Sequence, residues 1–311
     1  MMRLQYLIFS LVWCLLAACS DEKTESSSAS AAPVVSVPSK QKVAVVSAET
    51  NVYAHYANIN QAALAKLKNL SPVQADQFYI EYRKQVITAL EAINAQEQLF
   101  LDDFLNDANW DYDAISRQSK PSANMQKHIN HLNEYGLRYE DLGGGVAAIV
   151  PKVGIETELF ATKTTSEYRD FILQQDREST LVDSMDGAVV VSWRELADRA
   201  AAWERFVQNY PNSALLDEAE QKFQWNTYLF LFGLDNTPVE AVEYDEPEAE
   251  QLRQFYREIE AEWARYEQHY PRSRIVPMLA EARQIALLEG EARLDAVKRF
   301  RDRYLSDAFR S

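Results

Sequence analysis

The sequence predicts a mainly α-helical protein, with repeat-like helical hairpins in the C-terminal half and a small β element in the middle. Three observations predict this fold. After residue 50, apolar residues recur at helical spacing over most of the chain. The stretch 201–213 recurs, in similar form, at 261–273. Between residues 137 and 191, two short runs typical of strands and a triple glycine interrupt the helical pattern.

The first twenty residues predict export from the cytoplasm. Arg3 supplies a positive charge, and residues 4–16 form an apolar segment too short for a final bilayer-spanning helix. The sequence Leu16-Ala17-Ala18-Cys19 follows and resembles the lipobox of bacterial lipoproteins, in which the cysteine is acylated and becomes the new N-terminus. The resemblance implies a signal peptide over residues 1–18 and a lipid on Cys19. A conventional signal peptide cleaved after Ala-x-Ala and a transmembrane anchor are the alternatives.

The residues after Cys19 bear on location and partners. By the same resemblance, Ser20 implies export to the outer membrane, where the protein faces the periplasm. Residues 19–50 are rich in Ser, Ala, Pro and Val and lack helical periodicity, which predicts a flexible linker. The formal net charge of −15 disfavours nucleic acid as a partner, because binding a phosphate backbone requires a basic surface.

The next part of the chain, residues 51–190, is expected to be a helical domain. Helices are predicted over 52–70, 71–104 and 122–135. The second has a capping signature, with Ser71 at the N-cap, Pro72 at the first helical position and Gln74 at the third. The third is followed by Gly136, the residue type that most often ends a helix.

The small β element is expected inside this domain. Residues 137–139 and 146–150 flank Gly143-Gly144-Gly145, and 188–191 is another β-branched run. A buried helix start or a loop is the alternative for these short segments. The glycines lack the Lys-Ser or Lys-Thr of a phosphate-binding loop, so a hairpin or loop turn is the better interpretation.

Residues 191–311 are expected to form the hairpin repeat region. Ser192 to Glu195 is a capping box that begins a helix predicted to end near residue 210. Trp203, Phe206 and Tyr210 lie on one face of that helix. Pro211 ends it, because the residue before a proline disfavours the helical conformation, and Ser213 is expected at the N-cap of the next helix, 215–232. A degenerate third copy is predicted at 300–306, where leucine replaces proline.

The repeated motif, an aromatic residue followed after three residues by Tyr-Pro-x-Ser, resembles tetratricopeptide-like repeats, most closely those of bacterial envelope lipoproteins. The period of 60 residues departs from the usual 34. The resemblance implies stacked hairpins with a concave surface for a protein or peptide. The predicted partner-binding residues are Trp203, Tyr210, Trp263 and Tyr270. Aromatic residues at helical spacing also form ordinary helix cores, which is the alternative.

Few other residues indicate chemistry. His128, His131 and Glu134 share one helix face at a spacing that suits a divalent metal, although a solvated polar face explains them better. The acidic run 240–250 is expected to be a solvated loop, with a docking site for a basic partner as the alternative. The sequence predicts neither a metal nor a cofactor, and it offers no recognisable catalytic set.

The sequence therefore predicts a lipid-anchored periplasmic scaffold or adaptor, not an enzyme, that binds other cell-envelope proteins or peptides. The alternative is an envelope hydrolase that acts on peptidoglycan, and a third hypothesis is a binder of a small ligand. The hypotheses differ in what the structure should contain. A hydrolase needs a cleft with converging carboxylates of raised pKa, a small-ligand binder needs an enclosed apolar pocket, and an adaptor needs an open, aromatic-lined concavity between hairpins.

Overall fold

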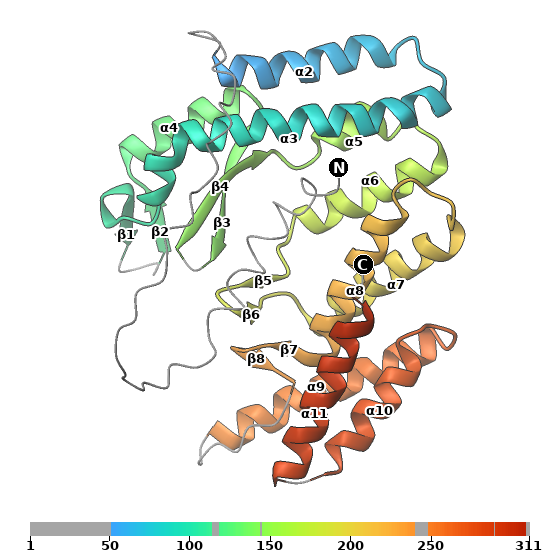
Figure 1. Ribbon diagram of the computed structural model, residues 1–311. Helices are drawn as coiled ribbons and strands as arrows, with labels where there is room; N and C mark the ends of the chain where they lie inside the picture. The colour runs from blue at the N-terminus through green and yellow to red at the C-terminus, as the bar shows by residue number, and fades with distance from the viewer. Residues whose placement is uncertain (1–50, 114–117, 144, 240–247, 289, 309–311) are drawn as a thin grey trace, which may run out of the picture. The chain divides into compact units, whose positions relative to one another are not determined.

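The chain is mainly helical, as predicted, and its strands form only small separate hairpins (Figure 1). The computed structural model describes residues 51–113, 118–143, 145–239, 248–288 and 290–308, and all of them belong to one compact unit. The predicted signal peptide, Cys19, the linker 19–50 and most of the acidic run lie outside the described residues. Within the described residues, no helix combines the length and the apolar content needed to cross a bilayer.

Two long helices begin the described chain. Helix α2 (Val52–Leu67) packs on α3 (Pro72–Asp102), as Figure 1 shows. The predicted capping box is present, since the Ser71 N–H donates to Gln74 Oε1 at 3.0 Å. The buried rings of Tyr79 and Tyr82 pack against Phe160, with ring centroids 5.1 and 4.9 Å away. Tyrosines therefore contribute to the buried faces of α2 and α3 beside aliphatic residues.

The predicted β element is a set of short antiparallel hairpins. Strands β1 (Trp110–Asp113) and β2 (Gln118–Pro121) precede α4 (Ala123–Glu134). Strands β3 (Leu137–Gly143) and β4 (Val146–Pro151) pair with Leu137 opposite Pro151, and Gly143 with φ of 79° lies at their turn. The interpretation of the glycines as a turn is therefore confirmed. Strands β5 (Ser184–Met185) and β6 (Ala188–Val189) form a third hairpin.

Two helices that the sequence did not predict separate the second and third hairpins. They are α5 (Ile155–Phe160) and α6 (Ser166–Ser179). Helix α6 is mostly polar and buries only three residues, all on one face: Tyr168, Phe171 and Ile172. This stripe spans little more than one helical turn, too little for a periodicity analysis to detect.

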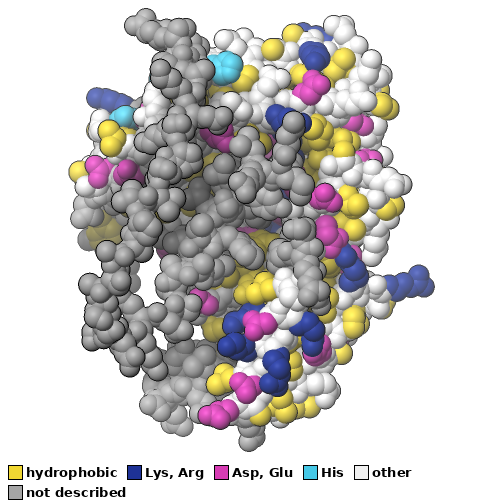
Figure 2. Space-filling view, in the orientation of Figure 1, with side chains coloured by type: hydrophobic (Ala, Val, Ile, Leu, Met, Phe, Trp, Pro, Cys, Tyr) yellow, Lys and Arg dark blue, Asp and Glu magenta, His cyan; other side chains and the backbone are white. Residues whose placement is uncertain are grey.

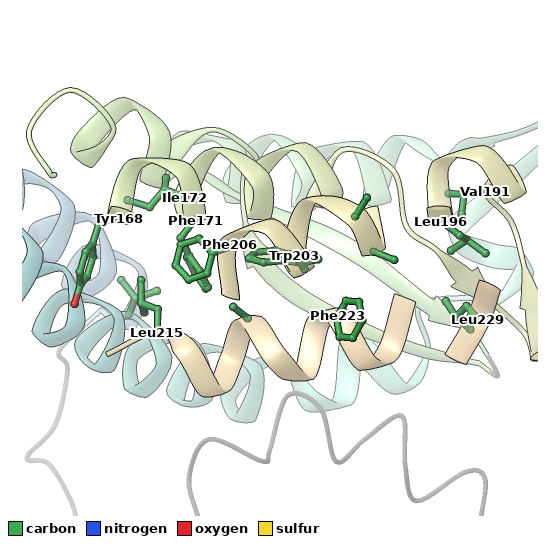
Figure 3. Packing of buried hydrophobic residues seen from close by; sticks show 14 of the residues in the cluster. Tyr168, Phe171, Ile172, Val191, Leu196, Trp203, Phe206, Leu215, Phe223 and Leu229 are labelled. Atoms are coloured by element: carbon green, nitrogen blue, oxygen red, sulfur yellow. The ribbon is translucent and has the colours of Figure 1, made fainter. Parts of the chain in front are cut away.

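Five helices follow: α7 (Trp193–Asn209), α8 (Leu216–Phe232), α9 (Glu248–His269), α10 (Val276–Ala286) and α11 (Gly290–Ala308). Helices α7 and α8 form a closely packed hairpin, and Figure 3 shows Trp203, Phe206, Phe223 and Leu229 among the side chains that fill it. The Ser192 hydroxyl accepts the Glu195 N–H at 3.1 Å, so α7 begins at its predicted cap.

The repeated turns have matching hydrogen bonds. The Ser213 N–H donates to the Tyr210 carbonyl at 3.0 Å, and the Ser273 N–H donates to the Tyr270 carbonyl at the same distance. Each serine hydroxyl then accepts the N–H two residues later, at 3.0 and 3.1 Å. The serines therefore cap the turn, and α8 begins after Leu215 rather than directly after Ser213. In the degenerate third copy, which lacks the proline, α11 continues past Tyr304.

The hairpin repeat region contains one β element that the sequence did not predict. Strands β7 (Gly233–Leu234) and β8 (Thr237–Pro238) form a hairpin between α8 and α9. Gly233 has φ of 66°, and a Cβ added there would lie 2.0 Å from the Thr237 carbonyl oxygen. Only glycine permits this close turn. The hairpin and the segment before α9 lengthen the repeat period.

Candidate functional site

The two tryptophans predicted to contact a partner are core residues instead. Trp203 is 0 % exposed and Trp263 is 4 % exposed. The Trp203 indole N–H donates to Glu178 Oε1 at 2.6 Å, and that of Trp263 donates to the Phe230 carbonyl at 3.2 Å. The prediction that the tryptophans contact a partner is therefore wrong, because the preceding helices, α6 and α8, cover both indoles. The alternative interpretation, a helix core, holds for them.

The two predicted tyrosines lie nearer the surface. Tyr210 is partly exposed, and its hydroxyl donates to Asp170 Oδ2 at 2.8 Å. This hydrogen bond raises the pKa of Tyr210 above its usual value, because it stabilises the protonated phenol. Tyr270 packs its ring on Tyr266 with centroids 4.9 Å apart. Of these aromatic residues, Tyr210 is the one that lies at a groove.

The groove runs between α6 and α7 and has a volume of about 390 Å³. We call it the α6–α7 groove. Its apolar part includes Leu173 of α6, which is 44 % exposed, and part of Phe206 of α7. The other residues that line it are Asp170, Gln174, Arg177, Ala202, Arg205, Asn209 and Tyr210. The groove is open and mixes apolar, aromatic and charged groups, as protein-binding sites do.

The charges in the groove are unequally paired. Arg177 lies 3.2 Å from Glu195, and Asp170 lies 3.8 Å from Arg169. Arg205 is exposed and makes no ion pair or hydrogen bond with any residue in the described part of the chain. Elsewhere acidic and basic side chains lie interspersed, as on the face in Figure 2. The groove therefore presents an exposed guanidinium that is unpaired among the described residues.

A second, smaller cavity of about 150 Å³ lies between α3, the β3–β4 hairpin, α5 and α6. Its charged groups come from Arg138, Glu140, Lys152, Glu156 and Asp176. Burial raises the pKa of Glu156, and one of its oxygens accepts the Tyr79 hydroxyl at 2.6 Å. A buried carboxylate of raised pKa is what the hydrolase alternative requires. The contact with Tyr79 also gives Glu156 a role in joining α3 to α5.

No family model, curated protein or solved structure matches this chain.

The candidate metal ligands do not converge. His128 stacks on Phe100 with centroids 4.2 Å apart, while His131 Nδ1 lies 3.9 Å from Glu134 Oε2. Among the described residues, no group of three His, Cys, Asp or Glu side chains is placed to hold a metal ion. The imidazole rings of His128 and His131 pack on neighbouring aromatic residues instead.

Of the residues that line the groove, the sequence predicted only Tyr210 as a binding residue, and Leu173 and Arg205 are two that it did not predict. Leu173 lies on α6, a helix that was not predicted. Arg205 had a signal, because arginine occupies the same position in both repeat copies as Arg205 and Arg265.

The raised pKa of Glu156 predicts a pH-dependent gain of stability on replacing it. The native state binds this proton more tightly than the unfolded chain, so native stability falls as pH rises from the unfolded pKa through the native pKa. We expect Glu156→Gln to raise the Tm by a few degrees at pH 8 and to change it little near pH 4, while keeping an oxygen for Tyr79. Thermal unfolding measured between pH 4 and 8 checks this. Glu158→Gln, an exposed position on α5, is the control, and an equal or lower Tm of Glu156→Gln at pH 8 would contradict the prediction.

Proposed function

We propose that this chain is a non-catalytic adaptor of the bacterial cell envelope that binds a segment of another envelope protein in the α6–α7 groove. The observation that carries the proposal is the groove itself, with Leu173 exposed beside Tyr210 and the unpaired Arg205. Tyrosine and arginine are enriched where proteins bind one another, and an exposed leucine beside them supplies apolar area. The groove adjoins the repeated hairpins, whose resemblance to tetratricopeptide-like repeats supports the same function.

The proposal includes a location. The lipobox at Leu16-Ala17-Ala18-Cys19 supports a lipid on Cys19 and an outer-membrane anchor facing the periplasm. A single acyl chain binds a bilayer only marginally, whereas several chains hold a protein there stably. The linker 19–50 would let the folded part reach partners away from the membrane surface. In envelope fractionation, we expect the protein in the membrane pellet and Cys19→Ala in the soluble fraction.

Site-specific photocrosslinking in living cells tests the adaptor function. A photoreactive phenylalanine analogue in place of Leu173 should give a discrete adduct with an envelope protein, because a bound segment would lie against that side chain. The same analogue in place of Leu64, an exposed leucine of α2, is the matched control and should give no such adduct. The proposal fails if position 173 gives no adduct, or only the adducts that position 64 gives.

The hydrolase alternative is favoured by Glu156 in the smaller cavity, beside Glu140 and Asp176. Its weakness is that Tyr79 already occupies one oxygen of Glu156. Release of soluble fragments from purified peptidoglycan by the protein, lost in Glu156→Gln, would establish the hydrolase in place of the adaptor.

A further inference from the structure

The second repeat copy shows what covers the outer face of its first helix. On α9, Arg265 Nη2 lies 3.0 Å from Asp198 Oδ1 of α7. One helical turn earlier, Glu262 lies 3.5 Å from Arg194, also of α7. The α9 face that carries Arg265 and Glu262 is therefore covered by the first helix of the preceding hairpin.

The equivalent face of the first copy lines the α6–α7 groove. With the offset of 60 residues, Arg205 of α7 corresponds to Arg265, and Ala202 corresponds to Glu262. Both Arg205 and Ala202 line the groove. The face of α7 that lines the groove is therefore equivalent to the face of α9 that packs against α7.

Helix α6 is the counterpart of α8 and not of the helix that covers α9. An acceptor on α6 binds the Trp203 indole N–H, and an acceptor on α8 binds the Trp263 indole N–H. Helix α6 therefore corresponds to α8, the second helix of a hairpin. The helix before α6 is α5, which has 6 residues where α7 has 17. Within the described chain, a full-length counterpart of α7 is therefore lacking in front of α6, and the groove lies on the face that such a helix would cover.

The charges of the groove define the chemistry of a helix that would fit there. In the second copy the arginine is paired with an aspartate from the covering helix, whereas Arg205 has no partner among the described residues. Alanine at position 202, where the other copy has a glutamate, leaves room beside the arginine. Leu173 and Tyr210 offer apolar surface to the same helix.

We propose that the α6–α7 groove binds an amphipathic helix of a partner protein that presents a carboxylate to Arg205, as Asp198 of α7 presents one to Arg265. This inference rests on the proposed adaptor function and names the class of segment that the groove takes. The partner helix completes the hairpin stack at its first layer, in the way α7 precedes α9.

The probe for this proposal is a lactam-bridged helical peptide with the sequence of residues 193–209, titrated into the full-length protein in detergent by fluorescence anisotropy. Its aspartate, at position 198, is expected to pair with Arg205. Arg205→Glu should weaken binding at least tenfold, because like charges then face each other in the groove. A peptide with Asp198→Lys should bind Arg205→Glu at least tenfold more tightly than the unchanged peptide does. Arg272→Glu, the same change at an exposed arginine in the α9–α10 turn, should leave binding unchanged.

Equal affinity of the peptide for the wild type and Arg205→Glu overturns the inference, as does the absence of binding or of rescue by Asp198→Lys. Circular dichroism of Arg205→Glu should match that of the wild type, since the side chain is exposed. Photocrosslinking at Leu173 separates this inference from the adaptor function. An adduct that persists in Arg205→Glu is consistent with the adaptor function and contradicts the pairing of Arg205 with a carboxylate of the bound helix. An adduct with a second copy of this chain contradicts the binding of a different protein.

Discussion

Trp203→Ala should lower the free energy of unfolding by about 3–5 kcal/mol, the usual cost of removing a large aromatic side chain from a core. The indole is fully buried, and its ring lies edge-on to Phe171 at 5.3 Å and to Phe206 at 6.2 Å between centroids (Figure 3). The substitution also removes the indole N–H that Glu178 accepts, so it leaves a carboxylate of raised pKa with fewer donors. Cavity and polar losses therefore act in the same direction.

Urea unfolding followed by circular dichroism measures this effect. Trp203→Phe should lose less than Trp203→Ala, because phenylalanine refills much of the volume. Tyr210→Phe is the surface control and should change the free energy of unfolding by under about 0.5 kcal/mol. A loss below about 1 kcal/mol for Trp203→Ala would show that the indole is not part of the α6–α7 core.

Arg83→Met should cost about 2–3 kcal/mol. Both terminal nitrogens of Arg83 on α3 donate to the two oxygens of Glu218 on α8, at 2.7 and 3.0 Å. Removing one member of a buried pair commonly costs 3–5 kcal/mol, because the other charge stays buried without its partner. These side chains are 21 % and 26 % exposed, so solvent screens part of that loss.

The double variant Arg83→Met/Glu218→Leu distinguishes the cause of this loss. It should be more stable than Arg83→Met alone, since neither charge is then left unpaired. Glu81→Gln, in the exposed pair of Lys66 and Glu81, should change stability by under about 0.5 kcal/mol. If the double variant is as unstable as the single one, packing of the arginine stem, and not the ion pair, holds α3 against α8.

Local signals made much of the fold predictable. The capping residues before α3 and α7 and the proline after Tyr210 act within one or two turns of chain, so the sequence alone locates these helix ends. The repeat predicted two equivalent turns, and the matching hydrogen bonds of Ser213 and Ser273 confirm them. Such local features can be predicted without knowing which other elements pack against them.

The groove was harder to predict, because it depends on which helix covers which face. Spacing alone puts Trp203, Phe206 and Tyr210 on one side of α7. Only the position of α6, a polar helix with a short buried stripe, decides that Trp203 lies inside and Tyr210 at the rim. The hairpin at Gly233 was missed for a related reason, since two-residue strands carry no periodicity.

The β7–β8 hairpin, which follows the first repeat copy, ties the repeat region to the middle of the chain. The Asn236 N–H donates to the Gly187 carbonyl at 2.8 Å, and the Thr237 hydroxyl accepts the Val189 N–H at 2.8 Å. Tetratricopeptide arrays grow by adding units that touch only their neighbours. A further copy of this sixty-residue unit would bring a hairpin that has no second β5–β6 hairpin to receive it. The tie thus limits how far such an array can lengthen by duplication, and it makes a fragment that starts at residue 191 incomplete.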